Sequence, residues 1–244
     1  MRLKKGAYVL PSFLTIGNMI CGFYSIILAL HKRYDEAGIF VLVAAICDAL
    51  DGRIARLTGT SSRFGIEFDS LADIISFGIA PALLIYLYDT AVGWLFCMIY
   101  LVSGGLRLAR FKIKSSEKPE DYFIGLPIPA ASGVVVSLVM IDYTIKLKLP
   151  SIIFIATLLL ISYLMISTLP YPTFKKYDFR RRTPTRLIWV SFLFIIILIK
   201  WFYQTMFVIC NLYALAGIGI AFYRSLRKKY TVVKEIDKDF QSHV

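Results

Sequence analysis

Long apolar stretches constrain this chain more than any other feature of its sequence. The 244 residues contain about eight windows of roughly 20 mostly apolar residues, separated by short polar connections. In the hydrocarbon core of a bilayer every backbone N–H and C=O must be satisfied within the chain, so such windows cross the membrane as helices. The predicted spans are 11–30, 36–57, 68–88, 91–109, 127–145, 150–168, 187–201 and 204–223.

The predicted fold class is therefore all-α, a polytopic membrane protein with about eight transmembrane helices in one bundle. Hydrophobic residues make up 58% of the chain, more than a soluble globular domain contains. No internal repeat and no linker rich in proline, glycine or serine divides the sequence. We expect a single membrane domain over residues 1–244, with a polar tail at 227–244.

The basic residues indicate which ends of the spans share a side of the membrane. The formal net charge of +12 would suit a nucleic-acid-binding protein, but the lysines and arginines lie at span ends and not in one basic domain. If the first span starts in the cytoplasm, 23 of the 28 fall on the cytoplasmic side, as the positive-inside rule demands. We therefore expect an integral protein of the cell membrane with both termini in the cytoplasm, and no nucleic-acid partner.

Four aspartates stand where the second predicted span ends and the third begins, and ionisable side chains near a span are functional candidates. Asp48 and Asp51 lie on the second span, and Asp69 and Asp73 on the third. On helices that turn about 100° per residue, the members of the two pairs lie about 60° and about 40° apart, so each pair shares a face. Two antiparallel helices can bring the four carboxylates together, and these would repel one another unless a multivalent cation lies among them. Oxygen-only ligands favour Mg²⁺, Mn²⁺ or Ca²⁺ over Zn²⁺.

Small and basic residues beside the aspartates suit a phosphate group. Gly52 follows Asp51, and Gly65 precedes Asp69 by one turn, so neither blocks the approach of a phosphate to the backbone. Arg56 lies one turn beyond Gly52, and its guanidinium can meet the phosphate from the same face. The alternative is that the aspartates form only interhelical ion pairs and helix N-caps.

The complete pattern reads Asp48-x-x-Asp51-Gly52-x-x-Ala55-Arg56, then eight residues, then Gly65-x-x-x-Asp69-x-x-x-Asp73. It resembles the signature of the CDP-alcohol phosphotransferase family. The resemblance implies a homodimer with two divalent ions, Mg²⁺ or Mn²⁺, that moves a phosphatidyl-type group from a CDP-linked lipid to an alcohol and releases CMP. The implied metal ligands are Asp48, Asp51, Asp69 and Asp73. The implied CDP-binding residues are Thr15, Asn18, Asp51, Gly52, Ala55, Arg56 and Gly65.

Four further stretches, 11–18, 107–111, 125–131 and 167–175, resemble the branch of that family whose acceptor is L-serine. This resemblance implies attack of the serine hydroxyl on the lipid-bearing phosphorus of CDP-diacylglycerol or CDP-archaeol, with Asp73 as the base by family analogy. Both histidines, His31 and His243, lie away from the predicted site. We therefore expect direct displacement at the cytoplasmic face, without a covalent intermediate.

Several alternatives stay open. Thr15 and Asn18 also suit polar contacts between helices. Arg107 and Arg110 end the fourth span, where they could bind the serine carboxylate or the donor phosphate, or could only anchor the topology. Inositol phosphate or glycerol phosphate could replace L-serine as the acceptor. A protein of another class, an ion-coupled secondary transporter, would favour carboxylates near the bilayer midplane and paired half-helices.

Overall fold

The computed structural model describes residues 9–58, 63–115, 122–172, 202–217 and 219–220. Within these ranges the regular secondary structure is helical apart from two strands of three residues each, and short connections join the elements. The helices are α1 (Val9–Leu30), α2 (Tyr34–Thr58), α3 (Arg63–Asp73), α4 (Ala80–Tyr88), α5 (Trp94–Ser115), α6 (Ile128–Ile145), α7 (Ser151–Ile166) and a further helix, Phe202–Gly217. The π-helical segment η2 (Ile74–Ile79) joins α3 to α4, and the short 3₁₀ helix η3 (Thr90–Val92) follows α4. The strands are β1 (Tyr122–Ile124) and β2 (Pro170–Pro172).

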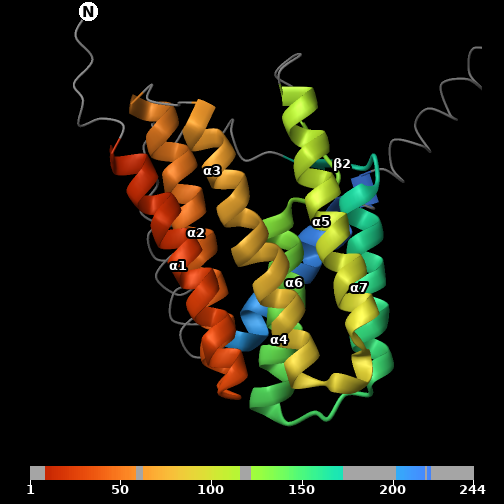
Figure 1. Cartoon of the computed structure of the whole chain (residues 1–244). Helices are drawn as coiled ribbons and strands as arrows, with labels where there is room; N and C mark the ends of the chain where they lie inside the picture. The colour runs from red at the N-terminus through yellow and green to blue at the C-terminus, as the bar shows by residue number, and fades with distance from the viewer. Residues whose placement is uncertain (1–8, 59–62, 116–121, 173–201, 218, 221–244) are drawn as a thin grey trace, which may run out of the picture.

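Successive long helices run in alternating directions through one bundle (Figure 1). The start of α1, the start of α3, the end of α5 and strand β2 lie at the upper end of Figure 1, whereas the α4–α5 and α6–α7 connections lie at the lower end. This alternation agrees with the sidedness inferred from the basic residues, because it places the predicted cytoplasmic connections at one end. The orientation in the membrane stays a prediction, and both termini lie outside the described residues.

Four of the described helical stretches are long and apolar enough to cross a membrane, judged by length and composition: Phe13–Leu30, Phe64–Tyr88, Trp94–Ile113 and Ile128–Ile145. Helix α2 has 25 residues but carries more charge, and α7 and Phe202–Gly217 are shorter apolar helices. Every predicted span except 187–201 overlaps a helix, and 187–201 lies outside the described residues. The all-α membrane fold is confirmed for the described part, while the count of eight spans stays a prediction.

A close approach between α1 and η2 brings the first span against the third. A Cβ atom on Gly22 would lie 2.6 Å from Cα of Ser76, a distance that packed atoms do not reach. The Ser76 hydroxyl donates a 2.9 Å hydrogen bond to the backbone oxygen of Asn18. Glycine at position 22 therefore lets α1 pack directly on η2, which begins one residue after Asp73.

The end of the bundle away from the aspartates is closed by buried polar and aromatic side chains. Asp142 on α6 accepts a 2.6 Å hydrogen bond from the Tyr88 hydroxyl and a 3.0 Å hydrogen bond from the backbone N–H of Leu149. The rings of Tyr34, Tyr88 and Tyr143 meet edge to face. Because two donors satisfy the Asp142 carboxylate, we assign this acidic residue a structural role at the α6–α7 connection.

A short β-ribbon ties together the ends of the last described helices. Strands β1 and β2 pair antiparallel, with Phe123 opposite Tyr171. After β1 the backbone turns at Gly125, whose φ is +78° and whose missing Cβ would lie 2.5 Å from the backbone oxygen of Met165. The Tyr171 hydroxyl donates a 3.1 Å hydrogen bond to the backbone oxygen of Ala214. The ribbon thus connects α6 and α7 to the helix Phe202–Gly217.

Candidate active site

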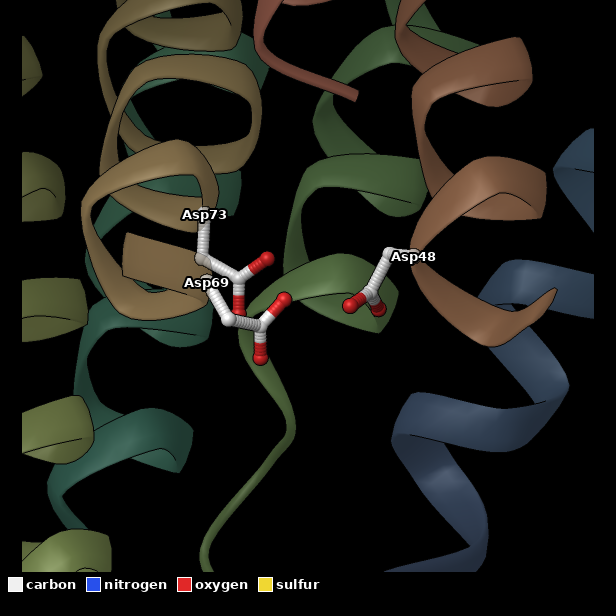
Figure 2. Close-up of side chains that lie close together, drawn as sticks. All are labelled: Asp48, Asp69 and Asp73. Atoms are coloured by element: carbon white, nitrogen blue, oxygen red, sulfur yellow. The ribbon is translucent and has the colours of Figure 1, made fainter. Parts of the chain in front are cut away.

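Three of the four predicted aspartates form one cluster between two helices. Asp48 comes from α2, and Asp69 and Asp73 come from adjacent turns of α3. One carboxylate oxygen from each lies within 4.8 Å of the others. Figure 2 shows the side chains of Asp69 and Asp73 pointing toward that of Asp48 across the space between the helices. The predicted meeting of the second and third spans is confirmed at these three residues.

The fourth aspartate, Asp51, lies beside this cluster and not within it. Its buried carboxylate accepts a hydrogen bond from the Thr15 hydroxyl of α1. It also interacts electrostatically with Asp69. Within the described residues, Asp51 is therefore a flanking carboxylate whose orientation depends on Thr15, and its role as a metal ligand stays a prediction.

Helix α1 reaches the acidic residues through two buried polar side chains, Thr15 and Asn18. While Thr15 bonds to Asp51, the Asn18 amide lies 3.4 Å from a carboxylate oxygen of Asp73. The side-chain oxygen of Asn18 is buried and has no hydrogen-bond partner among the described residues. A buried oxygen without a donor is costly unless a cation or a ligand donor satisfies it. Both residues thus contact aspartates of the acidic site, while their contact with CDP stays a prediction.

The two arginines predicted for the acceptor side differ in their surroundings. Arg107 is buried on α5, lies over the ring of Phe111 at 5.3 Å, and interacts electrostatically with Asp73 and Asp48. Arg110 instead donates a 2.9 Å hydrogen bond to the backbone oxygen of Ile166, the last residue of α7. Arg107 therefore belongs to the acidic site, whereas the contact of Arg110 stabilises a helix C-terminus.

Lys112 is a cationic neighbour of the site that the sequence did not single out. Its ammonium lies 2.5 Å from the Glu67 carboxylate on α3, and it also interacts electrostatically with Asp69. In the sequence, Lys112 is one of several basic residues at the end of the fourth span, and topology explains them all equally well. Only its ion pair with Glu67, which joins α5 to α3, distinguishes it.

The small residues of the predicted site lie on the helices that carry the aspartates. Gly52 and Ala55 are partly buried on α2, and Gly65 is partly buried on α3. Arg56 belongs to α2, but its side chain lies outside the described part of the structure. A phosphate contact of these residues stays a prediction.

The donor set fits a divalent metal ion. Three carboxylates within 4.8 Å repel one another, and a cation among them removes that repulsion. The unpartnered oxygen of Asn18 next to Asp73 adds a further hard oxygen atom. Carboxylate and amide oxygens suit Mg²⁺ or Mn²⁺. We conclude that this cluster could bind a divalent metal.

Comparison with known proteins identifies the family. The model for CDP-alcohol phosphatidyltransferases matches residues 8–169, a range that contains every residue of the site described above. The chain belongs to the CDP-alcohol phosphatidyltransferase family. Members of the family generally use divalent metals, which agrees with the acidic cluster, and the chain is accordingly a transferase of phospholipid biosynthesis.

Three of its similar relatives are named CDP-diacylglycerol--serine O-phosphatidyltransferase. A Helicobacter pylori protein is 40% identical over 175 residues, which cover 69% of this chain and 74% of the relative. A Bacillus subtilis protein is 38% identical over 172 residues, covering 69% of this chain and 92% of the relative. The archaeal Methanocaldococcus jannaschii protein is 36% identical over 168 residues, covering 68% and 74%.

Proposed function

We propose that this chain transfers the phosphatidyl group of CDP-diacylglycerol to the hydroxyl of L-serine, giving phosphatidylserine and CMP. The observation that carries the proposal is the cluster of Asp48, Asp69 and Asp73 in a family member whose relatives are named for this reaction. A relative of that name in an archaeon makes CDP-archaeol a second candidate donor, with an archaetidyl group transferred. Lipid tails bind to apolar protein surface, and such surface does not distinguish the ester-linked chains of CDP-diacylglycerol from the ether-linked chains of CDP-archaeol.

We propose that two divalent ions, Mg²⁺ or Mn²⁺, are held by Asp48, Asp51, Asp69 and Asp73. The three clustered carboxylates and the Asn18 oxygen support this assignment, and Asp51 is proposed because it flanks Asp69. When bound, such ions neutralise the pyrophosphate and stabilise the attacking and leaving oxygens of an in-line displacement.

The chain's own contribution is to orient both substrates and to accept a proton. Asp73 is proposed as the base, and its position is supported by Asn18, whose amide lies 3.4 Å away. As the serine oxygen bonds to the lipid-bearing phosphorus, the phosphorus–oxygen bond to CMP breaks, CMP leaves with the electron pair, and the hydroxyl proton passes to Asp73. A single displacement needs both substrates in place together.

The donor and acceptor are assigned to opposite sides of the cluster. The proposed CDP-binding residues are Thr15, Asn18, Asp51, Gly52, Ala55, Arg56 and Gly65, which come from α1, α2 and α3. Arg107 and Arg110 of α5 are proposed for the acceptor carboxylate or the lipid phosphate, and the proximity of Arg107 to Asp73 makes it the stronger candidate.

We propose that the site opens to the cytoplasm and that the protein works as a homodimer in the cell membrane. Asp69 and Asp73 lie in the first half of the continuous helical stretch Phe64–Tyr88, which starts at the end of the bundle where most basic connections are expected. The positive-inside rule assigns that end to the cytoplasm.

One assay tests the proposed reaction. Purified protein is given CDP-diacylglycerol, Mg²⁺ or Mn²⁺, and a panel of labelled acceptors: L-serine, inositol phosphate and glycerol phosphate. We expect labelled lipid only with L-serine, together with an equal amount of CMP. If labelled lipid forms from inositol phosphate or glycerol phosphate instead, L-serine is not the acceptor, but the proposed reaction class still holds.

A further inference from the structure

The third predicted span has a break in its α-helical hydrogen bonding directly after Asp73. Within the continuous helical stretch Phe64–Tyr88, the segment η2 is π-helical, and the N–H of Ala80 donates to the backbone oxygen of Ile75, five residues back. We propose that Tyr100 of α5 is a positioning residue for the acidic cluster, because its hydroxyl bonds to the backbone of this break. The inference rests on the proposed function and deepens it, since it names a residue outside the cluster that fixes where the metal ligands lie.

Pro81, in the first turn of α4, accounts for the break. A proline has no N–H, and in an α-helix its ring clashes with the carbonyl four residues earlier, which here is that of Phe77. A wider π-helical turn avoids this clash. The Phe77 carbonyl nevertheless loses the donor that residue 81 supplies in an ordinary α-helix, and both residues are buried.

The Tyr100 hydroxyl supplies the donor that Pro81 lacks. It donates a 2.7 Å hydrogen bond to the backbone oxygen of Phe77, and Tyr100 and Phe77 are both fully buried. A buried carbonyl without a donor is costly, so this bond stabilises the break in its observed form. The neighbouring Ser76 hydroxyl donates a 2.9 Å hydrogen bond to the backbone oxygen of Asn18 on α1. Hydrogen bonds with both α1 and α5 thus hold η2 in place.

A fixed break matters because the two halves of the helical stretch are under different forces. At the far end, the Tyr34 hydroxyl donates a 2.9 Å hydrogen bond to the backbone oxygen of Leu87 and so ties α4 to α2. At the other end, the carboxylates of α3 face that of Asp48 (Figure 2), and they repel one another until a cation lies among them. This repulsion favours bending at η2 that moves α3 away from α2, and the bond from Tyr100 opposes the bending.

A small bend at η2 is enough to disturb the metal ligands. At about 1.5 Å of rise per residue, Asp69 lies about 12 Å along the helix from Phe77, so a bend of about 10° moves it by about 2 Å. Metal–ligand distances in a functional site vary by only about 0.2 Å. Loss of the Tyr100 hydroxyl should therefore weaken metal binding, although no ligand is removed.

The test compares two tyrosines that bond to the same helical stretch, in the purified full-length protein without substrates. Tyr100→Phe removes the bond to Phe77, and Tyr34→Phe, the matched control, removes an equivalent bond to Leu87 at the far end. Mn²⁺ binding is measured from the EPR signal of free Mn²⁺. We expect Tyr100→Phe to weaken Mn²⁺ binding about tenfold, the lower limit for loss of an outer-shell partner, and Tyr34→Phe to leave it within about twofold.

Stability and transfer kinetics distinguish positioning from a general loss of structure. The melting temperature without metal should fall in both variants, since each loses one hydrogen bond to a carbonyl. In Tyr100→Phe alone, the Mn²⁺ concentration for half-maximal transfer should rise about tenfold, while the KM for L-serine at saturating Mn²⁺ stays within about twofold. Equal weakening of Mn²⁺ binding in both variants would overturn the positioning role, because the loss would then follow stability.

A double variant tests the bond itself and covers the case in which Tyr100→Phe does not fold. Pro81→Ala restores an N–H that can donate to the Phe77 carbonyl, so Tyr100→Phe combined with Pro81→Ala should bind Mn²⁺ within about threefold of the wild type. A double variant that does not fold, or that binds Mn²⁺ as weakly as Tyr100→Phe, would overturn the role of this bond.

The outcomes separate this inference from the proposed function. A wild-type protein that binds Mn²⁺ but does not use L-serine overturns the proposed reaction, while weaker Mn²⁺ binding in Tyr100→Phe still supports the role of Tyr100. A wild-type protein that uses L-serine while Tyr100→Phe binds Mn²⁺ normally overturns only the role of Tyr100. A wild-type protein that binds no Mn²⁺ or Mg²⁺ overturns the metal site, on which both proposals rest.

Discussion

At the scale of single residues, Asp48 and Asp69 should be indispensable for metal-dependent activity. Asparagine has nearly the same size as aspartate but lacks the charge that the cluster needs to bind a cation. Loss of an outer-shell partner of a metal costs about 10- to 100-fold, so Asp48→Asn and Asp69→Asn should each cost at least about 100-fold in kcat/KM. EDTA should abolish wild-type activity, and added Mn²⁺ or Mg²⁺ should restore it.

The control for these variants is their folding in detergent, measured by size-exclusion chromatography and thermal unfolding without metal. Removing one of three mutually repelling carboxylates should leave the metal-free protein at least as stable as the wild type. Full activity in either variant would remove that residue from the metal site. We expect Asp51→Asn to lose activity as well. Full activity in this variant would remove Asp51 from the metal site and leave it only its structural hydrogen bond with Thr15.

Asp73 should differ from the other aspartates if it serves mainly as the base. We expect Asp73→Asn to bind CDP-diacylglycerol with roughly unchanged affinity yet to lose about 100-fold to 10,000-fold in transfer rate, the range for general base catalysis. Equilibrium binding of the CDP-lipid and single-turnover transfer measure the two effects separately. If Asp73→Asn no longer binds metal, the main role of Asp73 is that of a metal ligand and not that of the base.

At the scale of elements, the packing of α1 on η2 should control the geometry of the site. In Gly22→Ala the added Cβ would lie 2.6 Å from Cα of Ser76, so α1 must move away from η2. This displacement should destabilise the protein by about 1–3 kcal/mol, as overpacking does. It should also lower transfer activity, because Asn18 moves away from Asp73 with the helix.

Gly105→Ala on α5 is the matched control, since a Cβ at that position meets no atom within 4 Å. Thermal unfolding and activity of both variants in the same detergent make the comparison. Equal melting temperatures for Gly22→Ala and Gly105→Ala would show that the α1–η2 contact carries no stability.

At the scale of the whole molecule, the direction of the bundle in the membrane can be measured. In a background without the four native cysteines, a cysteine placed in the 114–122 connection should react with a membrane-impermeant reagent only from the cytoplasm. A cysteine at Lys148, in the α6–α7 connection at the other end of the bundle, should react only from outside. Reversed labelling would overturn the proposed orientation and the cytoplasmic site.

The order of events is also a property of the whole site. Because direct displacement needs donor and acceptor bound together, enzyme given CDP-diacylglycerol and labelled CMP without L-serine should not exchange label into the lipid at a rate near turnover. The measurement is label in the lipid fraction over time, with and without L-serine. Fast exchange without serine would demonstrate a covalent phosphatidyl-enzyme and end the single-displacement scheme.

Much of this protein could be predicted from sequence because its determinants are local. The apolar windows predicted the helices, since a backbone in lipid must satisfy its own hydrogen bonds. Helical periodicity placed Asp69 and Asp73 on one face of α3, and the short 57–64 interval favoured an antiparallel partner that carries Asp48. The family signature lies within these segments, so the metal-binding character of the site followed from them as well.

Only the tertiary structure decided which neighbours complete the site. Periodicity says which residues share a face of one helix, but not how helices distant in sequence are rotated and spaced against each other. The close contact between Gly22 and Ser76 places α1 next to Asp73. Although Arg107 and Arg110 lie on the same helix, α5, Arg107 interacts with the acidic cluster and Arg110 with the end of α7. The Tyr171 hydroxyl bonds to the backbone oxygen of Ala214, on a helix that begins more than 30 residues further along the chain. Such contacts depend on side-chain packing between segments, which no local pattern in the sequence encodes.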